Sequence, residues 1–353
     1  MAIRLEHSEA LVTRAKAMVA PGKGILAADE STGTITKRFD SIGVESTEEN
    51  RRDYRELLFR SQGLGRSISG VILFDETIRQ KGADGTPLVA ILERQGVIPG
   101  IKVDRGAKPL AACPGETVTE GLDGLRARLR EYVELGAGFT KWRAVIRIGD
   151  EIPSRTCIEA NAHALARYAA LSQEAGLVPI VEPEVLMDGA HSIERCFEVT
   201  ERTLRQVFHE LGLQRVLLEG MVLKPNMVLS GKEAGDRAGD RAGPEEVAEH
   251  TVRCFLRTVP AAVPGIAFLS GGQGDEESTE NLDAINRRAA EVSAPWELTF
   301  SYGRGLQAAA LQTWQGRVEN RDATQETFLR RATVVAAARR GAWQPEMGSE
   351  GTG

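Results

Sequence analysis

Residues 177–185 read LVPIVEPEV, an apolar run that ends in two glutamates spaced two positions apart. The run lacks the strict alternation of apolar and polar residues that is typical of a sheet with one solvent-exposed face. It therefore predicts a strand buried on both faces, as in a parallel sheet. Seven other segments have the same character, and each is a candidate strand. They are GILAADE (24–30), SGVILFDE (69–76), IPGIKVD (98–104), FTKWRAVIRI (139–148), RVLLEGMVLKP (215–225), VPGIAFLSGG (263–272) and WELTFSYGR (296–304).

Segments with helical spacing separate these strands. Two of them open with a capping-box pattern, Ser46 with Glu49 and Thr117 with Glu120. Eight alternations of strand and helix predict an α/β fold, an eightfold parallel β/α (TIM) barrel, because eight parallel strands close on themselves. A doubly wound open sheet is the structural alternative. No G-x-G-x-x-G follows the first strand, however, which disfavours a dinucleotide site.

We expect one domain over residues 1–345, since α/β barrels often exceed 200 residues. Within it we expect an N-terminal helix in 1–22, the barrel in 23–320 and a C-terminal helix in 321–345, with the terminal helices capping the barrel. Residues 346–353 are expected to be a flexible tail, because glycine-rich chain loses much entropy on ordering. The duplication AGDRAGDRAG at 234–243 is predicted to be a loop insertion without chemistry.

The net charge is −6, from 44 basic and 50 acidic residues, so the chain has no general attraction to nucleic acid or anionic lipid. No apolar stretch approaches the roughly 18 residues that cross a bilayer, and the N-terminus lacks the apolar core of a signal peptide. The four cysteines show neither close pairing nor metal-ligand spacing, as expected of reduced thiols. We therefore expect a soluble cytoplasmic protein with no nucleic-acid or membrane partner.

Charged and polar residues stand late in the apolar runs, and the active site of a β/α barrel lies at those strand ends. Side chains two positions apart in a strand point to the same side, so paired residues can enter one central cavity. A single pair is ordinarily a salt bridge, but six or more strands contributing together indicate a function, because burying many charges is costly. The residues are Asp29, Glu30, Asp75, Glu76, Lys102, Asp104, Lys141, Arg143, Glu182, Glu184, Lys224, Ser270, Ser301 and Arg304.

Lys224 lies in the most apolar of these runs and is the candidate nucleophile. Burial and neighbouring cations lower the pKa of a lysine and free its amine to attack a carbonyl, and Lys102 and Lys141 are expected nearby. Glu182 and Glu184 would supply proton transfer, since two carboxylates close together push one pKa upward. An amine beside paired carboxylates indicates imine chemistry.

The glycine-rich ends of the last two strands indicate a phosphate site. In SGGQG (270–274) and YGRG (302–305), backbone N–H groups can approach an anion at a helix N-terminus, and Arg304 adds charge. A second anion site is predicted after the first strand, at Ser31, Thr34, Lys37 and Arg38. None of the five histidines ends a strand, so no metal site is predicted.

With these positions identified, the chain resembles class I fructose-bisphosphate aldolase over nearly its whole length. The matching stretches are GKGILAADEST, TEENRRDYRELL, GVILFDET, GIKVDRG, TKWRAVIRIG, PIVEPE, LEGMVLKPNMV, FLSGGQ, NLDAIN and LTFSYGR. The resemblance implies reversible cleavage of fructose 1,6-bisphosphate to dihydroxyacetone phosphate and glyceraldehyde 3-phosphate through a lysine Schiff base, in glycolysis or gluconeogenesis. It implies no metal and no cofactor, and a homotetramer.

The resemblance also implies residue roles. LKPNMV implies Lys224 as the Schiff-base lysine, and VEPE implies Glu182 as proton donor and acceptor with Glu184 in support. GILAADES implies that Asp29 takes the proton of the C4 hydroxyl, and TKWR that Lys141 keeps the cavity positive while Arg143 assists. The implied C1-phosphate site is Ser270, Gly271, Gly272, Ser301, Gly303 and Arg304. Lys37 and Arg38 are implied to line the phosphate-binding face, and Ser31, Thr34 and Lys102 to face the C6 phosphate.

Two alternatives remain open at this point. A transaldolase-like barrel lyase would share the lysine but not two phosphate sites, and a noncatalytic sugar-phosphate-binding scaffold would not need an acid, a base and an amine together. The chain also departs from the family in one respect. Animal members end in a tyrosine that reaches the active site, whereas no tyrosine follows Tyr302 here.

Overall fold

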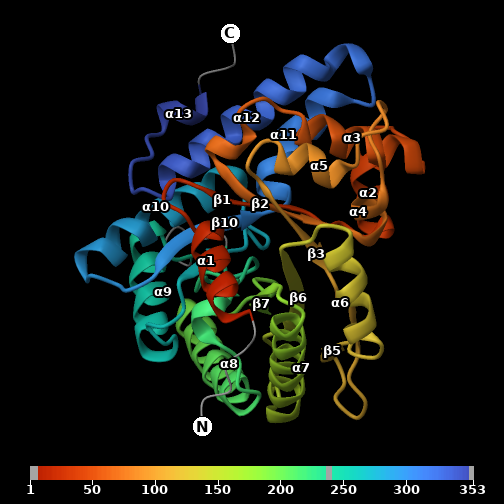
Figure 1. Ribbon diagram of the computed structural model, residues 1–353. Coiled ribbons are helices and arrows are strands. Elements are labelled where there is room, and N and C mark those ends of the chain that lie inside the picture. The colour runs from red at the N-terminus through yellow and green to blue at the C-terminus, as the bar shows by residue number, and fades with distance from the viewer. Residues whose placement is uncertain (1–6, 236–240, 350–353) are drawn as a thin grey trace.

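The structure is a computed structural model that describes residues 7–235 and 241–349. Eight strands form one closed parallel barrel in the order β1-β10-β9-β8-β7-β6-β3-β2 (Figure 1). The predicted eightfold parallel barrel is thus confirmed over the open-sheet alternative. Its strands are β1 Gly24–Ala28, β2 Ile68–Leu73, β3 Ile98–Lys102, β6 Phe139–Ile146, β7 Val178–Val185, β8 Val222–Leu223, β9 Gly265–Phe268 and β10 Glu297–Tyr302.

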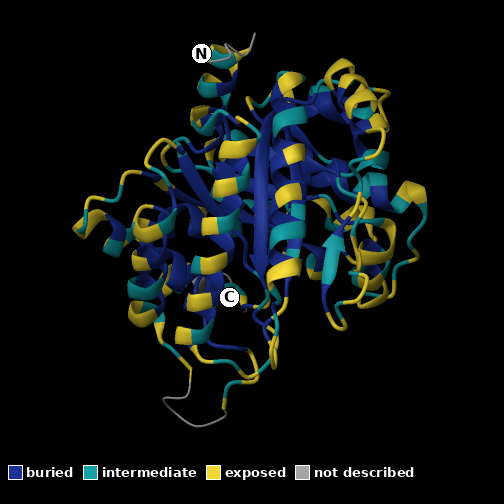
Figure 2. Ribbon diagram, turned by 90° about the horizontal axis from the view of Figure 1, so that it is seen from below, coloured by how far each residue is buried: buried dark blue, intermediate teal, exposed yellow. Residues whose placement is uncertain are grey.

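Helices form the outer layer, with one face buried on the barrel and the other exposed (Figure 2). The α-helices are α1 Ser8–Met18, α2 Thr32–Asp40, α3 Glu48–Phe59, α4 Asp75–Arg79, α5 Leu88–Glu93, α6 Leu125–Glu134, α7 Arg155–Glu174, α8 Ile193–Leu213, α9 Pro244–Thr258, α10 Asp275–Glu291, α11 Arg304–Trp314, α12 Arg321–Ala338 and α13 Glu346–Ser349. Short 3-10 helices are η1 Leu64–Arg66, η2 Leu218–Gly220 and η3 Val318–Asn320. Within the described ranges, none of these helices has the length and apolar character needed to span a bilayer.

The two ends of the chain carry helices where terminal helices were predicted, α1 within residues 1–22 and α12 within residues 321–345. Residues 1–6 lie outside the described residues. Of the predicted tail 346–353, residues 346–349 form α13 and residues 350–353 lie outside the described residues, as do residues 236–240 of the predicted loop insertion. The division into one domain and a flexible tail stays a prediction.

β8 is much shorter than the predicted strand 215–225, because η2 occupies part of that segment. After Leu223, the N–H of Lys224 still donates to the carbonyl of Val181 at 2.8 Å. The next residue, Pro225, has no N–H with which to continue the ladder. The strand therefore ends where the candidate nucleophile stands.

Both capping-box predictions were wrong in detail. Thr117–Thr119 is strand β5, which pairs antiparallel with β4 Ala107–Pro109, and the next helix begins only at Leu125. The β-branched Thr-Val-Thr sequence favours a strand over a helix start. Helix α3 is capped by Thr47, one residue later than predicted, and its hydroxyl accepts from the N–H of Asn50 at 3.1 Å.

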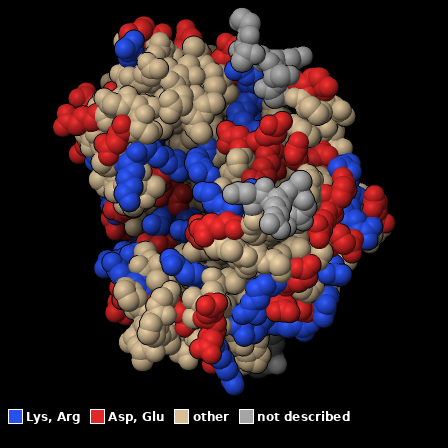
Figure 3. Space-filling model, turned by 180° about the vertical axis from the view of Figure 1, so that it is seen from behind, with Lys and Arg blue, Asp and Glu red and all other residues tan. Residues whose placement is uncertain are grey.

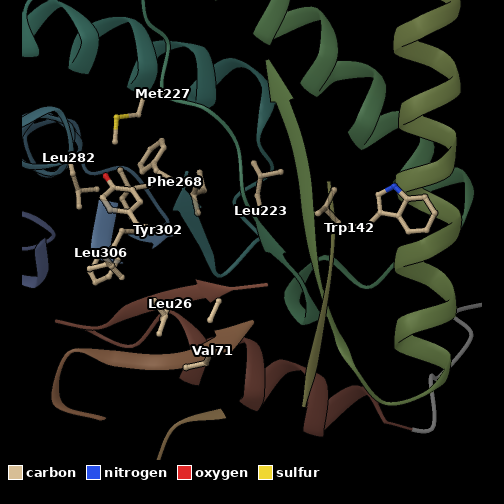
Figure 4. Close-up of a cluster of buried hydrophobic side chains, with 14 of the residues drawn as sticks. Leu26, Val71, Trp142, Leu223, Met227, Phe268, Leu282, Tyr302 and Leu306 are labelled. Atoms are coloured by element: carbon tan, nitrogen blue, oxygen red, sulfur yellow. The ribbon is translucent and has the colours of Figure 1, made fainter. Parts of the chain in front are cut away.

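Alternate strand residues pack on opposite sides of the barrel wall. The side chains that point outward, among them Leu26, Val71, Trp142 and Leu223, pack against the helices (Figure 4). Those that point inward include Ile25, Ala27, Phe139, Val178, Ile180 and Val222, and they form one cluster with Leu11, Ala15 and Met18 of α1. The ring of Phe139 fills the interior so closely that a Cβ on Gly100 would lie 2.2 Å from it. The barrel is therefore solid at the end that α1 covers.

Candidate active site

The same alternation carries charged side chains inward at the other end of the barrel. On β6, Phe139 is followed at two-residue steps by Lys141 and Arg143, and on β7, Ile180 is followed by Glu182 and Glu184. Asp29 follows the inward Ile25 and Ala27 in the same phase, and Lys224 follows the inward Val222. The interior thus changes from apolar to charged along the strands. The face opposite α1 is hollowed, and Lys and Arg side chains gather around the opening (Figure 3).

A chain of buried ion pairs joins the candidate catalytic residues. Lys141 Nζ lies 2.6 Å from Asp29 Oδ2 and 3.2 Å from Glu182 Oε2. Glu182 Oε1 in turn lies 3.2 Å from Lys224 Nζ. Lys141, Glu182 and Lys224 are 4%, 3% and 3% exposed. One carboxylate thus bridges two lysines in a place where few waters can screen the charges.

The surrounding charges set the proton affinities of this chain. Burial raises the pKa of Glu182, but Lys141, Lys224 and Arg143 outweigh it and hold the pKa below its usual value. Burial likewise raises the pKa of Asp29, yet Lys141, Lys224 and Lys102 lower it to about 2. Burial lowers the pKa of Lys141, but Asp29, Glu182 and Asp104 raise it overall. The expectation that Glu182 and Glu184 would push one carboxyl pKa upward is wrong for Glu182, because cations dominate its surroundings.

A second set of ion pairs flanks the first. Arg143 Nε donates a short hydrogen bond to Glu184 Oε2. Asp104 accepts from the backbone N–H groups of Gly106 and Arg143 at 3.1 and 3.2 Å, and Lys102 Nζ lies 3.4 Å from its Oδ1. Asp104 had been noted only as a charged strand end. Its structural position ties the β3 end to β6 and orients Lys102 toward the cavity.

A cavity of about 220 Å³ opens beside Asp29, Lys102, Lys141 and Arg143, and its lining does not include Glu182, Glu184 or Lys224. Ser31 and Thr34 lie at its wall with their hydroxyl oxygens 3.1 Å apart, and Arg38 is on the same face of α2. Lys37 is exposed and is not brought to the cavity. The lining residues are Ala27, Asp29, Glu30, Ser31, Thr34, Arg38, Lys102, Asp104, Gly106, Ala107, Lys141, Arg143, Val145 and Gly303.

The predicted C1-phosphate residues lie at the ends of β9 and β10, next to the N-termini of α10 and α11. The hydroxyl of Ser301 is buried and has no hydrogen-bond partner among the described residues, so its donor is available to a ligand. Gly272 has a φ of +83°, which favours glycine, whereas a Cβ on Gly271 would lie 2.4 Å from Leu269 Cδ1 and would displace the end of that side chain. Ser270 is 9% exposed. Arg304 is exposed and donates to the carbonyl of Gln273 at 2.9 Å, which links the two loops.

Sequence reasoning assigned no role to three features of this site. Glu30 and Asp104 were recognised as charged strand ends, but their partners lie far along the chain, on other elements. The β4-β5 hairpin, which brings Gly106 and Ala107 to the cavity, was read as the start of a helix. Gly106 directly before β4 and Gly115 in the turn between β4 and β5, with φ of +87° and +78°, were the available signal.

Metal ligands do not gather in the part of the chain that the structure describes. No three His, Cys, Asp or Glu side chains there are arranged to hold a metal ion. The four cysteines are unpaired, and three of them are buried.

The chain as a whole is similar to known proteins. A family model described as fructose-bisphosphate aldolase class-I matches residues 10–352. A probable fructose-bisphosphate aldolase class 1 of Xanthomonas campestris pv. campestris is 59% identical over 95% of this chain and 99% of its own length. The cytosolic fructose-bisphosphate aldolase 6 of Arabidopsis thaliana is 54% identical over 96% of this chain and 93% of its own. A crystal structure of fructose-bisphosphate aldolase from Plasmodium falciparum superposes with a TM-score of 0.94 at 49% identity, covering 98% of each chain.

Proposed function

The chain belongs to the class I fructose-bisphosphate aldolase family, and from this membership we propose that Lys224 is its Schiff-base lysine and Glu182 the proton carrier beside it. The enzyme cleaves fructose 1,6-bisphosphate reversibly to dihydroxyacetone phosphate and glyceraldehyde 3-phosphate, in glycolysis, through a lysine imine. The observation that carries the residue assignment is the buried Glu182 carboxylate, which lies 3.2 Å from both Lys224 Nζ and Lys141 Nζ. Covalent trapping of the imine with borohydride, followed by identification of the modified lysine, tests this assignment.

Imine formation needs a neutral amine and a group that moves protons. Lys224 attacks the C2 carbonyl of the substrate, and Glu182 takes protons from the Lys224 nitrogen and passes them to the C2 oxygen, which leaves as water. At the neutral carbinolamine stage, Lys224 no longer contributes a positive charge beside Glu182, so the carboxyl holds a proton more readily. Glu184 supports this step through its hydrogen bond with Arg143, which stays close to the same strand end.

Cleavage follows because the iminium at C2 draws electrons from the C3–C4 bond, which leaves an enamine rather than a free carbanion. Asp29 takes the proton of the C4 hydroxyl as the aldehyde forms. Lys141, 2.6 Å from Asp29, keeps this part of the cavity positive. The enamine then accepts a proton at C3, and water releases dihydroxyacetone phosphate from Lys224.

The phosphates are assigned to the two ends of the cavity. Ser270, Gly271, Gly272, Ser301, Gly303 and Arg304 bind the C1 phosphate, and the buried unpartnered hydroxyl of Ser301 supports this. Ser31, Thr34 and Lys102 face the C6 phosphate, with Arg38 between the two ends. Lys37 is the weakest member of the proposal, since its side chain is exposed on α2.

Arg304→Ala should lower kcat/KM for fructose 1,6-bisphosphate about 30-fold, because one charge-assisted contact to phosphate is lost. This corresponds to a loss of roughly 2 kcal/mol of transition-state stabilisation. The penalty should largely vanish for an unphosphorylated ketose, which offers no such contact. Steady-state kinetics on both substrates make the measurement, and Arg317→Ala, at an exposed position beyond α11, is the matched control. An equal penalty on both substrates would assign Arg304 a purely structural role.

Treatment with EDTA should leave cleavage of fructose 1,6-bisphosphate unchanged. The iminium is the electron sink in the proposed mechanism, so no Lewis acid is required at the carbonyl. Activity is measured before and after dialysis against the chelator. A loss that added zinc restores would contradict a mechanism based on Lys224.

The remaining assignments are coarser. We propose a cytoplasmic enzyme, since relatives from Arabidopsis thaliana and Spinacia oleracea are named cytosolic or cytoplasmic, and a homotetramer, as the family resemblance implies. Its small-molecule partners are sugar phosphates. Family membership favours this reading over a transaldolase-like lyase or a noncatalytic scaffold.

A further inference from the structure

Glu30 follows directly after Asp29, and its side chain is only 5% exposed. One carboxylate oxygen, Oε1, accepts a short hydrogen bond from Arg38 Nη1 and another from Gln307 Nε2 at 2.9 Å. The other oxygen, Oε2, is buried and has no hydrogen-bond partner among the described residues. Glu30 Oε2 could therefore accept a further hydrogen bond. Leaving a buried carboxylate oxygen without one costs free energy, because it has lost its hydration.

Arg55 of α3 lies on the other side of this carboxylate and is 1% exposed. Its Nη2 donates to the backbone carbonyl of Glu30 at 2.9 Å and lies 3.9 Å from Glu30 Oε2, and its Nη1 donates to Thr77 Oγ1 at 2.7 Å. Its Nε has no partner among the described residues. A small side-chain movement that shortens the 3.9 Å between Arg55 Nη2 and Glu30 Oε2 would therefore form a direct hydrogen bond between them.

The charges of this cluster do not balance. Two carboxylates, Glu30 and Glu76, face three guanidinium groups, those of Arg38, Arg51 and Arg55. Arg51 binds Glu76 with two hydrogen bonds, from Nε at 2.9 Å and from Nη2 at 2.5 Å. If Arg38 is left out, Arg51 and Arg55 neutralise the two carboxylates. Arg38 is the surplus cation.

Arg38 is also the most exposed member of the cluster. Its side chain is 25% exposed, against 10% for Arg51 and 1% for Arg55. It lines the cavity, and its Nη2 lies 3.8 Å from the position that a Cβ on Gly303 would occupy, beside the proposed C1-phosphate loop. The neighbouring Asp29 does not compete for it, because its carboxylate is paired with Lys141.

We propose that Arg55 is a positioning residue for phosphate binding, which takes over the Glu30 carboxylate when Arg38 turns from Glu30 to a substrate phosphate. The proposal rests on the proposed function, in which Arg38 meets phosphate. If Arg38 moved away and nothing replaced it, the buried Glu30 carboxylate would lose its main countercharge. The free-energy cost of that loss would oppose phosphate binding. Arg55, whose Nη2 lies 3.9 Å from Glu30 Oε2, removes most of this cost by pairing with the carboxylate. The availability of Arg38 is then set by a residue that never touches substrate.

The test combines two substitutions. Arg55→Met should raise KM for fructose 1,6-bisphosphate about tenfold with a smaller change in kcat, because Glu30 then retains Arg38 as its main countercharge. Adding Glu30→Gln should restore KM, since the competitor for Arg38 is gone while the amide still accepts from Gln307. Glu30→Gln alone should tighten competitive inhibition by inorganic phosphate, and this arm remains informative if Arg55→Met fails to fold.

Two outcomes would overturn the proposal. One is a double variant that stays as weak as Arg55→Met, which would make Arg55 merely structural. The other is weaker phosphate inhibition in Glu30→Gln, which would mean that Glu30 holds Arg38 in its binding pose. Arg52→Met is the control on the same helix, because this partly exposed arginine pairs with Asp53 and should leave KM unchanged. Arg38→Ala distinguishes failure of the Arg55 proposal from failure of the proposed phosphate site. An unchanged KM in this variant would mean that Arg38 does not bind the substrate phosphate.

Discussion

Sodium borohydride added together with dihydroxyacetone phosphate should inactivate the enzyme and leave one reduced adduct, on Lys224. Reduction converts the imine into a stable secondary amine, so peptide mapping by mass spectrometry identifies the lysine that formed it. The structure distinguishes the cavity lysines by their partners. Lys141 is held by Asp29 and Glu182, which raise its pKa and keep it as an ammonium ion, whereas Lys224 forms one ion pair among the described residues, with Glu182.

Lys224→Met should accordingly abolish trapping and lower cleavage by on the order of 10⁴-fold or more, since the covalent route is lost. Lys141→Met is the matched variant from the same cavity. It should slow cleavage but still form the adduct on Lys224. An adduct on Lys141 or Lys102 in the unmodified enzyme would refute the assignment of the nucleophile.

Replacing Glu182 with Gln should slow imine formation by on the order of 10²-fold or more, the usual contribution of a positioned acid–base group. The amide keeps the shape of the side chain but cannot pass a proton between Lys224 and the C2 oxygen. Rapid-quench trapping with borohydride in a single turnover measures the step directly. Because the pKa of Glu182 is lowered, its carboxylate stays ionised as pH falls from 7 to 5, and the step should show no acid limb from Glu182 in that range.

Glu184→Gln is the matched control, since Glu184 lies two residues after Glu182 on β7 and is hydrogen-bonded to Arg143. It should slow imine formation less than the Glu182 variant does. Equal effects of the two substitutions, or an unchanged rate in Glu182→Gln, would show that the proton travels by another route.

Residues whose role depends on their own strand were predictable from the sequence. Asp29, Lys141, Glu182 and Lys224 each continue an apolar run in the inward phase, and strand periodicity alone brings them to one end of the barrel. Lys37 shows where helix spacing did not suffice. Thr34 is three residues from Lys37 and four from Arg38, so spacing allows both on its face of α2, yet the cavity lining includes Arg38 and not Lys37.

Features that depend on distant partners could not be read from local patterns. The sequence shows Glu184 two positions from Glu182, which suggests a raised pKa, but it does not show that Lys141 and Arg143 of β6 lie beside it. The same limit applies to Glu30, whose buried partner Arg55 is 25 residues away on another element. Thr117 and Glu120 have the spacing of a helix start, but the β-branched Thr-Val-Thr sequence at 117–119 was a local signal for a strand, and the β4-β5 pairing confirms that signal.

The apolar cluster that Phe139 forms with α1 fills one end of the barrel, and the cavity lined by Asp29 and Lys141 opens at the other. A ligand therefore cannot pass through the barrel from end to end, and we expect substrate and products to use the end where the charged side chains lie. The three-carbon ketone remains covalently attached after the C3–C4 bond breaks, whereas the aldehyde is free to diffuse. Departure is therefore ordered by covalent attachment, with the aldehyde first, and in the reverse direction the ketone must be attached before the aldehyde can react with it.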